Sequence, residues 1–280
     1  MKPCPVCGSQ DSTPLFVQTL RHRRYVNTLC RRCGMAWVST RAKPSEYERF
    51  YTGDYAAKVY GFTGDAASIK EIIAWRTRRS KQKLQPFGKF WKRGTRVLEV
   101  GTGPGAFLKV LESAYGCRVW GIEPSPIFAK IARRYLGIKI YLGRVETWLS
   151  DKRCAFPKKF DVIVLDQVLE HILDPFKLIR DLSARLTEDG LLFLSVPNIS
   201  APKDTKKGLF VFEHVSGFSP FSLNLFLARL GFKLIALHAE APGSLQVVAA
   251  RFSAPFDMLP PGAVGKPLGK AEILKNFPVK

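Results

Sequence analysis

The chain has 280 residues, which is enough for one full α/β core and a small accessory domain at one end. Its composition, 46% hydrophobic and 24% charged, is typical of a globular protein, and no run of 18 uninterrupted apolar residues occurs that would predict a membrane span. The N-terminus lacks the apolar core of a signal peptide, so we expect a soluble, cytoplasmic protein.

The net charge of the chain is +21, and it is unevenly distributed. Residues 1–96 hold 20 Lys and Arg against 6 Asp and Glu, a net charge of +14, and the remainder carries +7. A basic surface attracts nucleic acid, anionic membranes or acidic metabolites, and an excess of charge can also simply increase solubility. From the charge we therefore expect weak, non-specific binding to nucleic acid.

Cysteine is concentrated near the N-terminus in two matching pairs. Cys4 and Cys7 belong to one Cys-x-x-Cys-Gly sequence, and a second contains Cys30 and Cys33. Two such turns supply four thiolates, a tetrahedral ligand set for zinc, whereas a reducing compartment disfavours disulfides. Because four protein ligands leave no position for water, the predicted zinc ion is structural. It replaces the core that a 40-residue ribbon is too small to build.

An aromatic stretch and a helix follow the ribbon. Residues 47–60 are rich in aromatic side chains, and Tyr51 and Tyr55 are candidates to close over a bound cofactor, although aromatic residues at this spacing also serve as core. From about Asp65 to Leu84, an apolar stripe opposes a side rich in Lys and Arg. This pattern predicts an amphipathic helix that packs on the domain after it.

The sequence from Arg96 to Phe107, RVLEVGTGPGAF, contains a buried strand, a glycine turn and the start of a helix. Gly101, Gly103 and Gly105 let the backbone turn sharply and let a ligand lie against the main chain. The N-terminus of the following helix, near Ala106, offers free N–H groups. The pattern predicts a nucleotide-type binding loop.

Two residues indicate which type of ligand the glycine loop binds. They are needed because Gly101-x-Gly103-x-x-Ala106 also fits a loose pattern of dinucleotide-binding loops. Pro104 removes a backbone donor where a pyrophosphate needs one. Glu99 adds a carboxylate that repels phosphate and suits a cation.

The spacing Glu99-x-Gly101-x-Gly103-x-Gly105 resembles the first motif of the class I S-adenosylmethionine-dependent methyltransferases. The ligand of that family carries an ammonium and a sulfonium and no phosphate. About 20 residues further on, the next predicted strand ends in Glu123, with Pro124 beside it. An acidic side chain at the carboxyl end of this strand can accept hydrogen bonds from both ribose hydroxyls, so we expect Glu123 to hold the cofactor.

From residue 96 onward, predicted strands alternate with helices, which is typical of a doubly wound parallel sheet. The predicted strands cover residues 96–100, 118–122, 138–142, 160–165, 191–196, 232–238 and 245–252. The last two are joined by a short turn and should form an antiparallel edge hairpin, as the methyltransferase resemblance also implies.

The predicted fold is therefore α/β, a Rossmann-like seven-stranded methyltransferase sheet plus an N-terminal zinc ribbon. Its predicted parts are a zinc ribbon over 1–40, a helical connector and cofactor lid over 41–93, a methyltransferase domain over 94–252 and an extended tail over 253–280.

Polar residues follow the fourth predicted strand of the sheet. Asp166 and Gln167 are placed to meet the cofactor, with Glu170 and His171 beyond them, because ligands of a parallel sheet bind at the carboxyl ends of its strands. This segment resembles the fourth-strand motif of the ubiquinone-biosynthesis-type O-methyltransferases. Some of those enzymes place Glu-x-x-Glu-His around a divalent metal, where this chain has Gln167-x-x-Glu170-His171. His171 is either a catalytic residue or an orienting one.

The segment from Phe212 to Phe232 is similar to one found in zinc-ribbon-bearing methyltransferases, including the sugar C-methyltransferases. The resemblance rests on Glu213-His214, a Phe-Ser pair and a helix that ends at a Gly-Phe pair. In the sugar enzymes a histidine here acts as base, aided by a tyrosine three residues earlier. His214 matches that histidine, and Val211 stands in place of the tyrosine.

Together these features predict a methyltransferase that transfers the methyl group of S-adenosylmethionine to a small-molecule acceptor such as a sugar, a phenolic compound or a related metabolite. One alternative is a zinc-ribbon methyltransferase of ribosomal or transfer RNA. Two further alternatives are a nucleotide-dependent oxidoreductase and a non-catalytic protein that binds through its ribbon.

Overall fold

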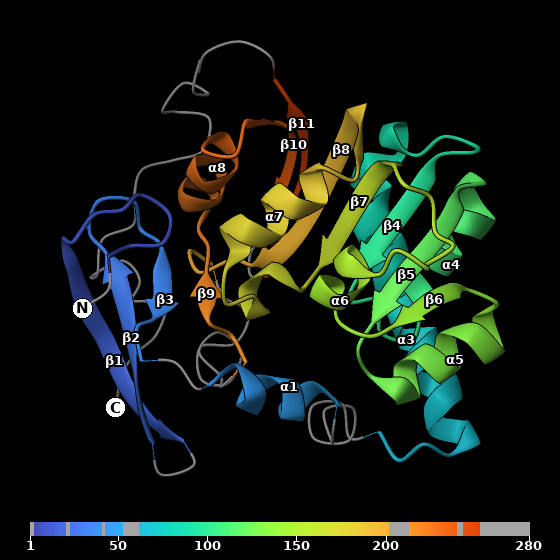
Figure 1. Cartoon of the computed structure of the whole chain (residues 1–280), viewed down its shortest axis with the longest axis horizontal. Coiled ribbons are helices and arrows are strands. Elements are labelled where there is room, and N and C mark those ends of the chain that lie inside the picture. Colours follow the sequence, from blue (N-terminus) through green and yellow to red (C-terminus); the bar gives the residue numbers. More distant parts are fainter. Residues whose placement is uncertain are drawn as a thin grey trace. The chain divides into compact units, whose positions relative to one another are not determined.

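A computed structural model describes residues 3–20, 23–40, 43–52, 62–201, 213–239 and 243–252 (Figure 1). The predicted tail over 253–280 and two named positions, Tyr55 and Val211, lie outside the described residues. No helix in the described part of the chain is both long enough and apolar enough to span a membrane.

The larger of two sheets has seven strands in the order β10-β11-β8-β7-β4-β5-β6 (Figure 1). Strand β4 pairs in parallel with both β5 and β7, and β5 pairs in parallel with β6, while β10 and β11 form the antiparallel hairpin at one edge. The predicted fold class is confirmed. The strands are β4 (Arg96–Val100), β5 (Arg118–Glu123), β6 (Lys139–Leu142), β7 (Phe160–Asp166), β8 (Leu186–Pro197), β10 (Phe232–Ala239) and β11 (Ser244–Arg251).

The helices connect these strands or lie before them in the chain. They are α1 (Pro44–Thr52), α3 (Ala66–Leu84), α4 (Ala106–Tyr115), α5 (Pro126–Leu136), α6 (Val145–Ser150), α7 (Pro175–Ser183) and α8 (Pro220–Ala228), with short 3₁₀ turns η1 (Gln85–Phe90) and η2 (Leu169–His171). The predicted amphipathic helix is α3, and it begins where Asp65 accepts a hydrogen bond from the Ser68 N–H as an N-cap. Its Ile72 packs against Phe128 and Ile131 of α5.

The smaller sheet is the N-terminal ribbon, with one strand from far along the chain. Its order is β1 (Ser12–Leu20), β2 (Arg23–Cys30), β3 (Ala36–Val38) and β9 (Ser216–Gly217), and the pairs β1–β2, β2–β3 and β3–β9 are antiparallel. The sequence did not predict β9, because two residues are too few for a periodic pattern. The pairing nevertheless joins the ribbon to the segment that contains His214.

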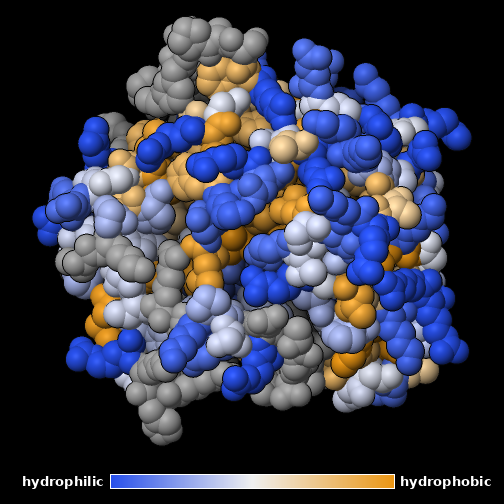
Figure 2. Space-filling view, viewed as in Figure 1, coloured by the Kyte–Doolittle hydropathy of each residue, from blue (hydrophilic) through white to orange (hydrophobic). Residues whose placement is uncertain are grey.

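The chain divides into two compact units, each described by itself below. The glycine-loop unit consists of Lys43–Asp166 and Asp181–Leu192. The ribbon unit consists of Met1–Ala42, Gln167–Arg180 and Phe193–Lys280. Hydrophilic side chains cover much of the face in Figure 2, and the exposed large apolar residues are scattered over several elements, from Val17 on β1 to Leu237 on β10. The predicted domain boundaries remain a prediction.

Candidate functional site

The glycine loop after β4 satisfies its own backbone donors. The N–H groups of Gly101 and Thr102 both donate to the carbonyl of Ile122, at 2.8 and 3.1 Å, and that of Gly105 donates to the Thr102 carbonyl at 3.2 Å. Residue 104 is proline and has no N–H. A pyrophosphate would therefore find no row of free donors in this loop, unlike the phosphate-binding loops of dinucleotide folds.

Two glycines of the loop are required for different reasons. Gly105 has φ of 86°, and a Cβ there would lie 2.9 Å from the Cβ of Ala132, so α4 approaches α5 too closely for any side chain. Gly103 has φ of 56°, and a Cβ there would meet no atom within 4 Å. The loop is thus closed by packing at Gly105 and open beside Gly103, which leaves room for a ligand against its main chain.

Glu123, at the end of β5, is bound to this loop by its carboxylate. One oxygen accepts a hydrogen bond of 2.6 Å from the Gly103 N–H, and the other accepts one of 2.8 Å from the Ser125 N–H. Burial raises the pKa of Glu123 to about 7, although both hydrogen bonds act in the opposite direction. Each carboxylate oxygen keeps a second lone pair, so Glu123 can still accept two hydroxyl donors. Pro124 is half-buried beside it.

Glu99, in β4, is a second buried carboxylate in the same unit. Only 2% of its surface is exposed, and its Oε2 has no hydrogen-bond partner among the residues that the structure describes. Burial raises its pKa well above 4.5, and the nearby charges of Asp166 and Glu123 act in the same direction. A buried carboxylate oxygen without a partner is costly, and a cationic donor would satisfy it.

Two basic side chains of α3 face these acids. Lys83, with 5% of its surface exposed, forms a buried ion pair with Asp166 at the end of β7. The positive charge of Arg76 lowers the pKa of both Glu99 and Glu123, so it lies near both carboxylates. The sequence pattern predicts both residues on the basic side of this amphipathic helix, opposite its apolar stripe. The only sequence signal for the burial of Lys83 is its position beside Leu84, at the end of the apolar stripe of the helix.

The ribbon unit contains a histidine pair at the end of the η2 turn. The rings of His171 and His214 meet edge to face, with centroids 4.7 Å apart and planes at 72°. The Nδ1 of His171 lies 3.2 Å from the carbonyl oxygen of Glu213. Because a carbonyl can only accept, this Nδ1 is assigned the proton, and Nε2 is then an acceptor in the neutral ring. Burial and the neighbouring His214 lower the pKa of His171 well below 6.5, so the ring is neutral at physiological pH.

Glu170 completes a group of three side chains that could ligate one cation. Its Oε1 lies 3.8 Å from the Nε2 of His171, too far for a hydrogen bond between them. One ligand atom each from Glu170, His171 and His214 lie within 4.8 Å of one another. Two imidazoles and one carboxylate are ligands that suit a divalent transition metal, and three protein ligands leave a position for a substrate.

Gln167, predicted to meet the cofactor, is held in an uncommon conformation. Its φ is 58°, in the left-handed region that non-glycine residues rarely adopt. Its backbone N–H donates to the Ser195 carbonyl at 2.8 Å, and its side-chain Nε2 donates to the Ser195 hydroxyl at 3.0 Å. Strain of this kind persists where the surrounding structure enforces it and is common at functional sites.

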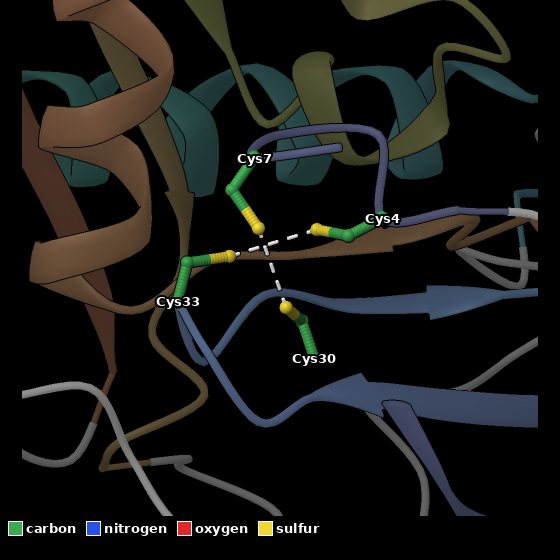
Figure 3. A group of neighbouring side chains, drawn as sticks. All are labelled: Cys4, Cys7, Cys30 and Cys33. Atoms are coloured by element: carbon green, nitrogen blue, oxygen red, sulfur yellow. Dashed lines mark hydrogen bonds between the residues drawn. The ribbon is translucent and has the colours of Figure 1, made fainter. Parts of the chain in front are cut away.

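The four predicted zinc ligands converge in the ribbon (Figure 3). The sulfurs of Cys4 and Cys33 are 3.6 Å apart, and those of Cys7 and Cys30 are 3.4 Å apart, with all four cysteines free. A tetrahedron with Zn–S bonds of 2.3 Å has edges of about 3.8 Å, so the four thiols fit one tetrahedral ion. The contact with Cys33 lowers the pKa of the Cys4 thiol to about 5, and the same contact together with burial raises the pKa of Cys33.

A family model described as a methyltransferase domain matches residues 72–237, more than half of the chain, and the protein belongs to that family. The match includes the glycine loop, Glu123 and the segment from Asp166 to His214. The chain therefore carries an S-adenosylmethionine-dependent methyltransferase domain. The predicted family resemblance is confirmed.

Relatives agree with this assignment over part of their length. The ubiquinone biosynthesis O-methyltransferase of Actinobacillus pleuropneumoniae is 33% identical over 110 residues, which are 38% of this chain and 47% of that enzyme. The chain thus spans about half the length of that relative. The enzyme of the same name from Histophilus somni is 33% identical over 160 residues, 55% of this chain and 64% of that one.

Solved structures share the fold at low identity. A methyltransferase from Archaeoglobus fulgidus is 17% identical, with a TM-score of 0.52 over 62% of this chain and 94% of its own. Magnesium protoporphyrin IX methyltransferase from Synechocystis, solved with bound SAH, is 16% identical, with a TM-score of 0.50 over 75% of this chain and 100% of its own. At these identities the likeness concerns the fold alone.

Proposed function

We propose that the protein transfers the methyl group of S-adenosylmethionine to a small-molecule acceptor, such as a sugar, a phenolic compound or a related metabolite. The observation that carries the proposal is the glycine loop, which turns its N–H groups toward Ile122, Thr102 and Glu123 instead of toward a ligand. A phosphate-bearing nucleotide gains nothing from such a loop, while a cationic, hydroxyl-bearing ligand matches the carboxylates beside it.

The buried charges of the glycine-loop unit support the same ligand. Glu99, Glu123 and Asp166 supply up to three negative charges against two positive ones from Arg76 and Lys83. S-adenosylmethionine carries an ammonium, a sulfonium and a carboxylate, so its net positive charge complements this excess. We assign Glu99 to the ammonium end, Arg76 to the carboxylate and Glu123 to the ribose hydroxyls. When bound, the cofactor supplies an electrophilic methyl group.

We assign His214 as the general base that takes the proton of the acceptor, as its resemblance to the sugar enzymes implies. His171 is the orienting partner, because its Nδ1 is engaged by the Glu213 carbonyl next to His214 in the chain. A His171 that stays neutral does not repel the proton that His214 gains. Gln167 and Pro124 complete the proposed cofactor contacts.

In the ribbon we propose one structural zinc ion, held by Cys4, Cys7, Cys30 and Cys33. The sulfur distances and the closed set of four ligands support zinc over a catalytic metal with an open position.

The test combines cofactor binding with product analysis. Calorimetry should detect binding of S-adenosylhomocysteine and none of NAD. Labelled methyl groups should then appear in the small-molecule fraction of a cell extract and not in its RNA. The His214→Asn variant should lose about 10²- to 10⁴-fold in turnover while its affinity for S-adenosylhomocysteine is unchanged. The surface variant His238→Asn is the control. Tight NAD binding without binding of S-adenosylhomocysteine would refute the proposal.

Methylation of RNA is the second candidate, favoured by one observation. Trp75 on α3 is 39% exposed, and the guanidinium groups of Arg76 and Arg79 lie 5.3 and 5.4 Å from its ring. An exposed aromatic ring among basic residues suits a stacked base beside phosphates. Label in one RNA position, with none in small molecules, would establish this candidate.

A further inference from the structure

The segment from Glu213 to Arg229 is attached to the cysteine ribbon at both ends. At its start, β9 pairs with β3, so that Ser216 lies opposite Trp37 and Gly217 opposite Ala36. The Val38 N–H also donates to the Val215 carbonyl at 3.1 Å. Val215 directly follows His214 in the chain, so the ribbon fixes the backbone one residue from the proposed base.

The two attachments lead to different cysteine turns. Strand β3 follows the turn of Cys30 and Cys33, which is closed by hydrogen bonds from the Cys30 N–H to the Met35 carbonyl at 2.9 Å and from the Gly34 N–H to the Cys30 carbonyl at 3.0 Å. At the far end, Arg229, the C-cap of α8, donates through Nη1 to the carbonyl of Val6 in the Cys4–Cys7 turn. The two turns meet directly through the Cys4–Cys33 and Cys7–Cys30 thiol contacts, and an ion bound by all four cysteines would join them further.

Between these attachments the segment has little freedom. Phe218 and Val215 are fully buried, and a Cβ at Gly217 would lie 2.9 Å from the Cγ2 of Ile199. Ser219 and Ser222 form a capping box that starts α8 directly after β9. A displacement of either end is therefore transmitted along the segment and not absorbed in a loop.

The other side of the segment leads to the histidine pair. The Val215 N–H donates to the Glu170 carbonyl at 2.8 Å, and the Glu213 carbonyl binds the Nδ1 of His171. Val215 is thus hydrogen-bonded to the ribbon through its carbonyl and to the η2 turn through its N–H. One residue thus connects strand β3, which follows the Cys30–Cys33 turn, to the η2 turn that carries His171.

We infer that the metal-bound ribbon is a positioning element for the His171–His214 pair, with Val38 and Arg229 as the positioning residues. The role of His214 as a base rests on the proposed function. The coupling between the ribbon and the two histidines can be tested without measuring turnover. Thermodynamic linkage makes this coupling reciprocal: if the bound metal stabilises the position of the segment, the positioned segment must raise the metal affinity of the ribbon. Weakening the Arg229 contact should therefore lower that affinity.

The test compares the full-length protein with and without its metal by hydrogen exchange. Removal of the metal with a chelator should accelerate exchange at the Val38, Val215 and Gly217 amides by about tenfold or more, because their cooperative unit opens. The 15N signal of the His171 Nδ1 should shift as its hydrogen bond to Glu213 is lost. Binding of S-adenosylhomocysteine, which reports on the glycine-loop unit, should change by less than about twofold.

Two variants separate positioning from general loss of structure. Arg229→Met, which leaves all four cysteines in place, should weaken zinc affinity by about tenfold and shift the His171 signal, and Arg229→Lys should restore part of both. Lys233→Met, an exposed change on β10, should alter neither. The inference is overturned if metal loss accelerates exchange in residues 4–38 while residues 213–218 and the His171 signal stay unchanged. Absence of turnover in every variant would instead refute the proposed function and leave these results standing.

Discussion

The glycine loop and the cysteine ribbon both gather polar atoms around a small space, and they differ in what completes them. The loop's donors are matched by acceptors of the same unit: the Ile122 carbonyl, the Thr102 carbonyl and the Glu123 carboxylate. The ribbon's four thiols have mainly one another and the backbone of their turns. The loop is therefore formed before its ligand binds, whereas the ribbon would be completed by the proposed ion.

A second contrast concerns charge. The glycine-loop unit contains buried carboxylates whose pKa values are raised by burial. Keeping these carboxylates ionised costs free energy until a cation binds beside them. In the ribbon the ligands are thiols that must lose protons to bind metal. In the proposed function, the cofactor would reduce an energetic cost within a formed fold, whereas the zinc ion would itself supply folding energy.

The largest expected effect comes from breaking the ribbon at one ligand. Cys30→Ser should lose the metal and with it about 10 kcal/mol or more of binding energy that acts as folding energy, so β1 to β3 should lose their order. The glycine-loop unit should keep its affinity for S-adenosylhomocysteine, because its bonds are internal. Elemental analysis, circular dichroism and calorimetry measure the three quantities.

The matched control is Cys154→Ser, a cysteine outside the cluster, which should retain one zinc ion per chain. If the purified protein contains no metal and its four ribbon cysteines are cross-linked as disulfides, the ribbon is not a metal site.

Breaking the loop side has the next largest effect. Glu123→Ala removes two charge-assisted hydrogen bonds to the ribose, each contributing about 1.5–3 kcal/mol, and it also leaves the Gly103 and Ser125 N–H groups without their acceptor. Affinity for S-adenosylhomocysteine should fall by about 10²- to 10⁴-fold in calorimetry. Glu112→Ala, which removes an exposed partner of Lys109, should leave the affinity unchanged. An unchanged affinity in Glu123→Ala would reassign the ribose contact.

The sequence predicted the features that depend on residues close together in the chain. The cysteine turns, the glycine loop and the start of α3 at Asp65 are of this kind, because turn geometry and capping act over a few residues. The seven strands were predicted from short apolar runs, since a buried parallel strand needs such residues on both faces. Strand β8, Leu186–Pro197, begins five residues before the predicted 191–196 and ends one residue after it.

The features that the sequence could not predict depend on packing between distant segments. The side of α3 that faces the carboxylates is decided by how the helix packs, and Lys83 and Asp166 are 83 residues apart. Strand β9 is recognisable only through its pairing with β3. The roles proposed for His171, His214 and Gln167 remain predictions.

Changes in pH should affect the glycine-loop unit in two opposite ways, through the stability of the ligand-free protein and through its affinity for the cofactor. The folded pKa of Glu123, about 7, lies above its ordinary value of 4.5, so its contribution to the stability of the ligand-free protein is complete below about pH 4.5 and is lost as pH rises through 7. A shift of this size corresponds to about 3 kcal/mol. Cofactor affinity should change in the opposite sense, since the ionised carboxylate is the better acceptor, and should weaken by up to about tenfold per pH unit below 7.

Urea unfolding and calorimetry between about pH 5.5 and about pH 8 measure both trends. Glu123→Gln cannot titrate, so both pH dependences in this window should flatten in that variant whatever its absolute stability. An affinity of the unmodified protein that is constant across this range would show that Glu123 is already ionised when the cofactor arrives.

The smallest expected effect concerns the exposed basic residues of α3, which, unlike Arg76 and Lys83 of the same helix, belong to neither binding region. Arg79 lies over the exposed ring of Trp75, and Arg78 and Lys81 are exposed basic residues of the same helix. Single-stranded RNA should therefore bind weakly, with an affinity that falls log-linearly with salt and is lost near physiological ionic strength. Replacing these three residues with Gln should reduce the slope by about 2, whereas replacing Lys152, Arg153 and Lys158, which removes the same charge elsewhere, should change it less. Trp75→Ala should weaken RNA binding by about tenfold, since stacking contributes about 1–3 kcal/mol per base.

Methyl transfer to a small-molecule acceptor should persist at high salt, because the glycine-loop carboxylates are buried and poorly screened. Tight, salt-resistant binding of one structured RNA, with methylation at a single position, would instead make α3 part of a substrate site and favour the RNA candidate.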